Sequence, residues 1–179
     1  YDALELPYPK FVSLPPIMNE AGNKKLGKRD GAKDILEYRA DGYLPETMVN
    51  FLALIGWNPG TEQELFSLEE LIKAFSVEQI QKSGGAFNTE KLDWMNREYL
   101  HKMGPADFEQ YVLNALPESV KELPQYSPER VSKLAPTIQE RAGTAKAITE
   151  AAEAGEYTYA FAEPDYAADL LKWKNDDSV

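Results

Sequence analysis

The chain contains no cysteine and only one histidine, His101. The absence of thiols excludes disulfides, thiolate zinc sites, iron–sulfur clusters and cysteine nucleophiles. A single histidine excludes a His-rich metal cage, and no D-x-[DN]-x-[DN]-G calcium loop is present. We therefore expect no metal ion held by the protein's own side chains. We interpret His101 as a surface or helix-end residue.

Long apolar runs are also missing. No stretch approaches the ~18 residues that a membrane-spanning helix needs. The first residues, Tyr1–Glu5, lack the basic and apolar regions of a signal peptide. We expect no membrane partner and a reducing, cytoplasmic location. The chain begins with Tyr1 rather than methionine, which suggests a fragment or a processed product.

Positive charge is scarce. Lys and Arg number 19 against 30 Asp and Glu, and the formal net charge is -11. Such a protein is a poor non-specific binder of nucleic acid or anionic lipid. Any contact with a polyanion must therefore come from a local basic patch. The length of 179 residues, 43% of them hydrophobic, allows one ordinary domain or two small ones.

Strand-like sequence is confined to residues 1–20. Apolar and small polar residues alternate over Phe11–Leu14, and Pro15-Pro16 then interrupts the pattern. So short a β segment cannot stand alone. We expect it to belong to a larger sheet whose other strands lie upstream of Tyr1.

From about Lys33 onward the pattern is helical. The segment from Leu44-Pro45 to Gly56 is apolar nearly all round, which predicts a helix buried among others. Ser67 and Ser76 each begin a sequence that fits a capping box. Apolar residues at helical spacing then predict stripes that face a core: Leu68, Leu71, Ile72 and Phe75; Leu92, Met95 and Tyr99; Phe108, Tyr111, Val112 and Leu116.

The segment Pro117–Pro128 holds three prolines in twelve residues and is the best candidate for a linker. Ser127-Pro128 is typical of a helix start. We expect one further helix over about 143–154 and a last one over about 165–173. No internal repeat is present.

One segment reverses the charge balance. Between Gly22 and Arg39, six cations face three carboxylates: Lys24, Lys25, Lys28, Arg29, Lys33 and Arg39 against Asp30, Asp34 and Glu37. Clustered lysines on a flexible loop suit a polyphosphate, because ammonium groups can follow charge that moves during phosphoryl or nucleotidyl transfer. Composition alone favours an ordinary solvated loop over a phosphate-binding one. We interpret the three carboxylates as charge balance and helix capping.

Two motifs compete for this loop. Residues 22–28 satisfy G-x-x-x-x-G-K, the start of a P-loop, but Arg29 stands where Ser or Thr should ligate magnesium. The alternative is Lys25-Leu26-Gly27-Lys28-Arg29, which resembles the K-[ML]-S-K-[SR] loop of class I aminoacyl-tRNA synthetases. The flanking segments are similar to bacterial-type glutamyl-tRNA synthetases: Pro9–Pro15, Asn19-Glu20, Tyr38–Glu46, Asn50–Trp57, Phe66–Leu71 and Lys91–Asn96. The resemblance covers nearly the whole chain and is strongest over residues 9–100.

The resemblance implies a mainly α fold in three parts. Residues 1–32 would be the end of a Rossmann-type nucleotide-binding catalytic domain, with its small β remnant. Residues 33–116 would form a helical stem-contact domain, and residues 117–179 the beginning of an α-helical anticodon-binding domain. The implied enzyme is a monomeric glutamate–tRNA ligase, which activates glutamate with ATP and transfers it to the 3′ end of tRNA-Glu.

The resemblance also implies the site residues. ATP would be bound by Lys25, Leu26, Gly27, Lys28 and Arg29. Lys25 and Lys28 would be catalytic and contact the phosphates, and Leu26 would pack against the adenosine side. Mg²⁺ would be held mainly by the ATP phosphates.

Two departures from the family pattern stand out. Gly27 replaces the usual Ser of the loop, and Ser13 replaces the His that many relatives have before Leu-Pro. The H-I-G-H segment and the glutamate pocket would lie upstream of Tyr1, so we expect no aminoacylation by these 179 residues alone.

Glu140–Val179 carries a net charge of -5, which repels phosphate. Either its basic side chains lie together on one face, or this end of the chain barely contacts RNA. The resemblance implies that the residues that read anticodon bases lie beyond Val179. The alternative function is a non-catalytic helical module that binds protein.

Overall fold

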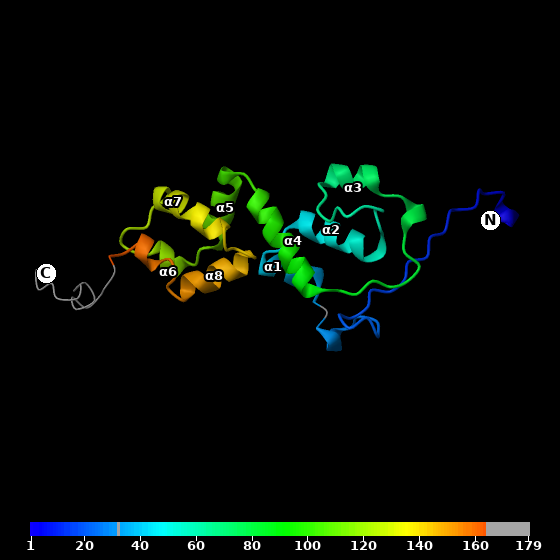
Figure 1. The fold of residues 1–179 in the computed structure, drawn as a ribbon, viewed down its shortest axis with the longest axis horizontal. Coiled ribbons are helices and arrows are strands. Elements are labelled where there is room, and N and C mark those ends of the chain that lie inside the picture. Colours follow the sequence, from blue (N-terminus) through cyan, green and yellow to red (C-terminus); the bar gives the residue numbers. More distant parts are fainter. Residues whose placement is uncertain (32, 164–179) are drawn as a thin grey trace, which may run out of the picture. The chain divides into compact units, whose positions relative to one another are not determined.

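The computed structural model describes residues 1–31 and 33–163. The chain divides into two compact units, unit 1 (Tyr1–Tyr99) and unit 2 (Leu100–Val179). Helices dominate the described part of both units (Figure 1), and β pairing is limited there to isolated bridges. The expectation of a mainly α fold is therefore confirmed.

Unit 1 contains short helices joined by well-defined turns. Its elements are the 3₁₀ turns η1 (Asp2–Leu4), η2 (Lys28–Asp30) and η3 (Val77–Gln79), and the helices α1 (Ile35–Asp41), α2 (Pro45–Gly56), α3 (Leu68–Ala74) and α4 (Thr89–Lys102, in this unit up to Tyr99). Pro45 occupies the first turn of α2, as the sequence predicts. Gly42 ends α1 in the left-handed conformation, at φ 87°.

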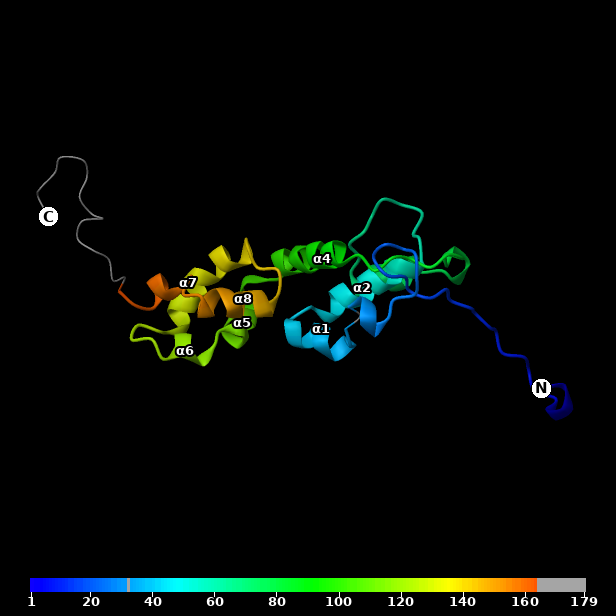
Figure 2. The ribbon, with the colours of Figure 1, turned by 90° about the horizontal axis from the view of Figure 1, so that it is seen from below.

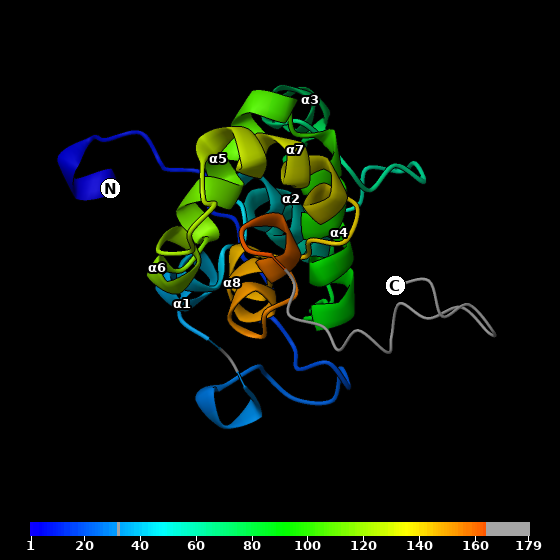
Figure 3. The same cartoon turned by 90° about the vertical axis from the view of Figure 1, so that its left-hand side faces the viewer.

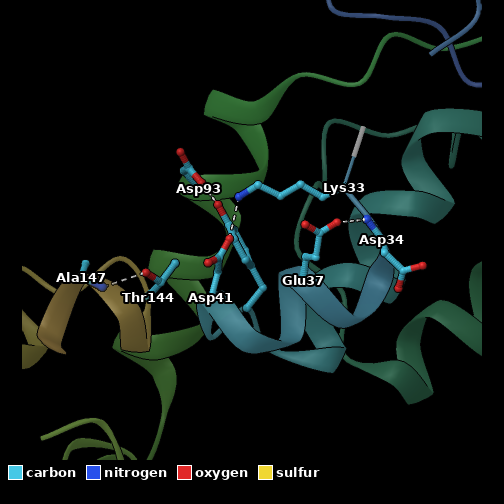
Figure 4. A network of polar contacts seen from close by, with 8 residues as sticks. Lys33, Asp34, Glu37, Asp41, Asp93, Thr144 and Ala147 are labelled. Carbon is cyan, nitrogen blue, oxygen red and sulfur yellow. Dashed lines mark hydrogen bonds and ion pairs between the residues drawn. The ribbon is translucent and has the colours of Figure 1, made fainter. Parts of the chain in front are cut away.

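Side-chain caps fix where two of these helices begin. Asp34 Oδ1 accepts the Leu36 amide at 2.9 Å, and Glu37 Oε2 accepts the Asp34 amide at 2.6 Å. Figure 4 shows the contact between Asp34 and Glu37. The capping role predicted for these carboxylates is confirmed. Ser67 forms the same reciprocal box with Glu70 at the start of α3. Such boxes satisfy backbone donors that the first helical turn leaves free.

The second predicted capping box is wrong. Ser76 precedes η3, but its hydroxyl donates to the Glu78 carboxylate at 2.8 Å and caps no backbone amide. A three-residue 3₁₀ turn does not present the N3 amide in the position that an α-helix gives it. The motif here therefore makes a local side-chain contact instead of a cap.

We expect Ser67→Ala to lower the free energy of unfolding by about 1 kcal/mol, because it removes a real cap. The matched change Ser76→Ala should cost less than about 0.5 kcal/mol, the usual range for surface positions. Urea denaturation of the two variants measures both values. Equal losses would contradict the difference in hydrogen bonding between the two serines.

The main core of unit 1 lies between α1, α2, α4 and residues 84–87. It buries Tyr38, Met48, Phe51, Ile55, Phe87, Leu92 and Met95. A smaller cluster joins Trp57, Phe66 and Leu71. The predicted burial of Leu92 and Met95 is confirmed, and the buried Trp57 is the largest side chain of the smaller cluster.

Two burial predictions are wrong. In α2, Val49 and Leu52 are 47% and 40% exposed, so this helix buries one face rather than its whole circumference. In α3 only Leu71 is buried, and Ile72 is 69% exposed. Helical spacing correctly identifies residues that share a face. It does not show whether another element covers that face.

The expected β segment near the N-terminus is not a strand in the described residues. Figure 2 shows it as an extended trace, and Phe11 and Leu14 are 83% and 67% exposed. A strand is defined by its ladder of hydrogen bonds to a neighbour. Within residues 1–31 and 33–163 such pairing reaches Met18 but none of residues 11–14.

Unit 2 is a helical cluster. It contains α5 (Pro105–Ala115), α6 (Glu118–Lys121), α7 (Pro128–Gln139), α8 (Ala145–Glu153) and the 3₁₀ turn η4 (Thr158–Ala160). Helix α5 packs against α7 and α8, and α6 contacts α8. Ser127 and Thr144 cap α7 and α8, and the amide of Ala147 donates to Thr144 Oγ1 at 3.2 Å (Figure 4). The helices predicted to start at Ser127 and over about 143–154 are confirmed.

The Pro117–Pro128 segment is not a boundary between compact units. The units divide between Tyr99 and Leu100. Val120 is buried, and the Gln125 amide donates to the Phe161 carbonyl at 3.0 Å. The prolines therefore shape turns inside unit 2, because α5 before them packs on α7 and α8 after them. The helix expected over 165–173, with Trp173, lies outside the described residues.

Candidate nucleotide-contacting loop

The lysine-rich motif is carried by a tight hairpin-like turn. Met18 pairs with Lys25 in antiparallel fashion, and the Leu26 amide donates to the Ile17 carbonyl at 2.9 Å. Asn19 shapes the turn between them: its Oδ1 accepts the amides of Asn23 and Lys24 at 3.1 and 3.3 Å. Gly22 supplies the left-handed residue of the turn, at φ 68°.

The base of this turn is fixed to the body of unit 1. The Met18 amide donates to the Gly85 carbonyl at 2.9 Å, and the Phe87 amide donates to the Met18 carbonyl at 3.0 Å. Ile17 and Leu26 pack against the main core cluster, which includes Phe87. Leu26 is thus half-buried between two exposed basic residues. The backbone that carries the lysines therefore starts from a rigid platform.

Gly84 and Gly85 make this attachment possible, a role that the sequence pattern did not reveal. A Cβ on Gly84 would overlap the Pro16 carbonyl oxygen, and a Cβ on Gly85 would overlap the Ile55 carbonyl oxygen. The sequence shows these glycines only as a break between helices. Because these two residues have no side chain, their segment can lie close to two others. Gly84 approaches Pro16, which precedes the lysine-rich turn, and Gly85 approaches Ile55 near the end of α2.

The cations themselves point to solvent. Lys25, Lys28 and Arg29 are exposed, and in the described part of the chain no salt bridge ties any of the three to a carboxylate. Gly27 has extended backbone angles, φ -140° and ψ 168°, and precedes η2. Any residue adopts these angles, so the backbone does not require glycine at this position. Serine, usual in the family, would fit the same conformation.

The structure excludes the P-loop interpretation. A P-loop joins a strand to a helix whose N-terminus faces the phosphates. Here residues 11–16 form no strand, and Lys28 begins a 3₁₀ turn of three residues that ends at Asp30. The G-x-x-x-x-G-K match is therefore coincidental.

A polar network supports the segment that follows the loop. Lys33 forms an ion pair with Asp41 at 2.6 Å, across α1 (Figure 4). The Tyr43 hydroxyl donates to the Asp93 carboxylate, and the Leu44 amide donates to the buried Asn96 Oδ1 at 2.9 Å. These contacts hold the turn between α1 and α2 against α4. Burial and the neighbouring Asp93 raise the pKa of Tyr43 well above its usual value near 10.

Unit 1 should lose stability as the pH rises above 10. The unfolded chain releases the Tyr43 proton near pH 10, whereas the folded chain keeps it, so alkaline pH favours unfolding. Tyr43→Phe should flatten this dependence and lower stability at neutral pH. Tyr38 and Tyr99, whose pKa values burial also raises, contribute in the same direction, as does Lys33, whose pKa its hydrogen bond to Asp41 raises. Melting curves from pH 8 to 11 test this, and an unchanged slope in the variant would contradict it.

Comparison with known proteins confirms the resemblance. Residues 1–94 match the family described as "tRNA synthetases class I (E and Q), catalytic domain". The glutamate–tRNA ligase of Clostridium novyi is 49% identical over 113 residues, which are 63% of this chain and 23% of that protein. Glutamate–tRNA ligase 2 of Nitratiruptor sp. is 43% identical over 156 residues, 84% of this chain and 32% of that protein.

A solved structure of a glutamate–tRNA synthetase has a similar fold. The crystal structure of glutamate–tRNA synthetase from Elizabethkingia anophelis superposes with a TM-score of 0.74 at 29% identity, over 96% of this chain and 37% of that chain. The present chain thus spans between 23% and 37% of these relatives' length. Because the family pattern covers more than half of its residues and includes the lysine-rich turn, this chain belongs to the class I tRNA synthetases of the E and Q type.

Proposed function

We propose that the chain is the part of a glutamate–tRNA ligase that closes a lysine-rich loop over ATP and docks tRNA through its helices. The observation that carries the proposal is the anchored turn. It packs the half-buried Leu26 against the core of unit 1 and leaves Lys25, Lys28 and Arg29 exposed. The match to the class I family, over residues 1–94, includes this turn.

The proposed reaction has two steps. The glutamate carboxylate attacks the α-phosphate of ATP, which forms glutamyl-adenylate and releases pyrophosphate. The terminal ribose hydroxyl of tRNA-Glu then attacks the activated carbonyl, and AMP leaves. Negative charge builds on the pyrophosphate in the first step, so cations placed beside it lower the barrier.

Each residue of the loop has a distinct part in this proposal. Lys25 sits at the fixed base and would bind the phosphates in the ground state. Lys28 lies beyond Gly27 and would follow the leaving pyrophosphate, while Leu26 would contact the adenosine side. In residues 1–31 and 33–163 no cluster of three His, Asp or Glu side chains could hold a metal ion. Mg²⁺ that accompanies ATP would therefore take its ligands mainly from the phosphates.

The helices supply the second part of the proposal. We assign residues 33–116 to contact with the tRNA stem and residues 117–179 to the start of the anticodon-binding region. This functional division differs from the division into compact units. We also propose that the ligase is a monomer that acts in the cytoplasm. The described helices include none long and apolar enough to cross a membrane.

Binding to tRNA-Glu tests the proposal against a protein-binding module. The 179-residue chain should bind labelled tRNA-Glu, with an unrelated tRNA as competitor, and the affinity should fall as salt rises, because phosphate contacts release counterions. Circular dichroism checks that the chain is folded. A folded chain that binds no tRNA at low salt would contradict the proposal and favour the protein-binding module.

A further inference from the structure

One asparagine side chain closes the turn that carries the lysine-rich motif. Asn19 Oδ1 accepts the amides of Asn23 and Lys24 at 3.1 and 3.3 Å. The backbone of Asn19 adds two bonds: its amide donates to the Lys24 carbonyl at 2.8 Å, and its carbonyl accepts the Gly22 amide at 2.8 Å. Lys24 is therefore bound to Asn19 through both its N–H and its C=O group, and Lys25 follows directly.

The turn itself is exposed to solvent. Figure 3 shows the turn and η2, in blue, projecting from the helices of unit 1. Residues 20–25 are all exposed, whereas Asn19 is half-buried where the turn begins. A segment without buried side chains gains no packing energy to offset the conformational entropy that it loses when it becomes ordered. Hydrogen bonds therefore decide the shape of this turn, and those of Asn19 span it.

The bonds of Asn19 also set the direction of Lys25. After Lys24, the chain pairs with Met18 at Lys25, and Leu26 packs against the core of unit 1. Consecutive residues of an extended segment point to opposite sides, so Lys25 points away from that core and is exposed. A shift of the pairing by one residue would exchange the two sides. Asn19 opposes such a shift because it holds Lys24, the residue before Lys25.

A lysine that is already held in place binds phosphate more tightly than one on a disordered loop. The disordered loop must lose backbone freedom when the ligand binds, and this loss weakens the complex. In this chain the loss occurs when the turn folds. Lys28 is affected less, because it lies beyond Gly27 and belongs to the separate turn η2.

We propose that Asn19 is a positioning residue for ATP, which acts through the backbone of Lys24 to hold the Lys25 ammonium group at the phosphates. The inference rests on the proposed function, which supplies ATP as the ligand. Asn19 itself contacts no phosphate in this account. Its contribution is to the binding of ATP and not to the chemical step.

The kinetics of a complete ligase test this role. A chimaera of Nitratiruptor ligase 2, in which these 179 residues replace the homologous span, provides the enzyme. Asn19→Ala should raise the KM for ATP about tenfold and leave kcat within about twofold, because a contact made equally in the ground and transition states affects KM alone. Asn23→Ala is the matched control, since Asn23 is exposed in the same turn and uses only its backbone amide for hydrogen bonding to the described residues. Equal KM values for the two variants overturn the inference.

Two further variants separate positioning from a general loss of structure. Asn19→Asp keeps an oxygen that accepts the same amides, so its KM for ATP should lie within about threefold of the unmodified value. In a Lys25→Gln background, Asn19→Ala should raise the KM by less than about twofold, because its effect passes through Lys25. Additive effects of the two changes, or an Asp variant as impaired as the Ala variant, overturn the inference.

Amide hydrogen exchange in the 179-residue chain tests the hydrogen bond itself. The protection of the Lys24 amide should fall about fivefold in Asn19→Ala and stay unchanged in Asn23→Ala. The melting temperatures of the variants check that unit 1 remains folded. Equal protection of the Lys24 amide in the two variants shows that the Asn19 side chain does not hold the turn, and this result overturns the inference.

The failure of the inference differs from the failure of the proposed function. A chimaera that activates glutamate, with the same KM for ATP in the Asn19→Ala and Asn23→Ala variants, overturns only the inference. A folded chimaera without activity, beside an active parent ligase, contradicts the proposed function and therefore the inference as well.

Discussion

Replacing Lys28 with alanine should slow glutamyl-adenylate formation about a hundredfold while changing the KM for ATP little. Lys28 is exposed beyond the anchored turn. In the proposed function its ammonium group follows the charge that develops on the leaving pyrophosphate. A donor used mainly in the transition state affects kcat more than ground-state binding. Loss of one such donor typically costs 10²- to 10³-fold, that is roughly a hundredfold or more.

The measurement needs a complete enzyme. We suggest Nitratiruptor ligase 2 in which these 179 residues replace the homologous span, since the two align over 84% of this chain. Pre-steady-state adenylate formation gives the rate directly. Lys82→Ala, an exposed lysine of unit 1 outside the loop, is the control and should leave the rate unchanged. A Lys28 variant that loses ATP affinity at an unchanged rate would contradict the assigned role.

Replacing Gly85 with alanine should lower the free energy of unfolding of unit 1 by about 3 kcal/mol, the upper part of the range for overpacked sites. The added Cβ would overlap the Ile55 carbonyl oxygen and lie 2.9 Å from the Ile55 Cγ2. Backbone atoms cannot rotate away as a side-chain end can, so the segment must shift. That shift also strains the bond between the Gly85 carbonyl and the Met18 amide.

A second glycine in the same unit serves as control. Gly56 ends α2, and a Cβ there would meet nothing within 4 Å. Gly56→Ala should be neutral or stabilising by up to about 1 kcal/mol, because alanine favours a helix more than glycine. Guanidinium unfolding of both variants separates steric overlap from a general effect of replacing glycine. Similar stability of the two variants would contradict the close approach at Gly85.

Local signals in the sequence predict helix starts well. Asp34, Ser67 and Ser127 cap helices as expected, and Pro45 opens α2. These signals succeed because a cap depends on a few neighbouring residues. The capping prediction for Ser76 is wrong because it considered only those neighbouring residues. They fit the capping pattern, but no α-helix follows Ser76.

Features that depend on distant segments were not predictable. Ile72 has core spacing but no covering element, and Gly85 looks like a break until Ile55 is placed beside it. For the lysine-rich turn, the motif predicted which residues carry the positive charge. The structure adds that backbone bonds of Met18 and the packing of Leu26 fix the turn to unit 1.

Glutamate-dependent pyrophosphate exchange by the unmodified chimaera tests the central claim most directly. If the chain is the loop-bearing part of a glutamate–tRNA ligase, the chimaera should exchange pyrophosphate into ATP in the presence of glutamate and tRNA-Glu, and should not do so without glutamate. Its circular dichroism and melting temperature show whether it is folded. A folded chimaera without exchange, beside an active parent ligase, would contradict the claim.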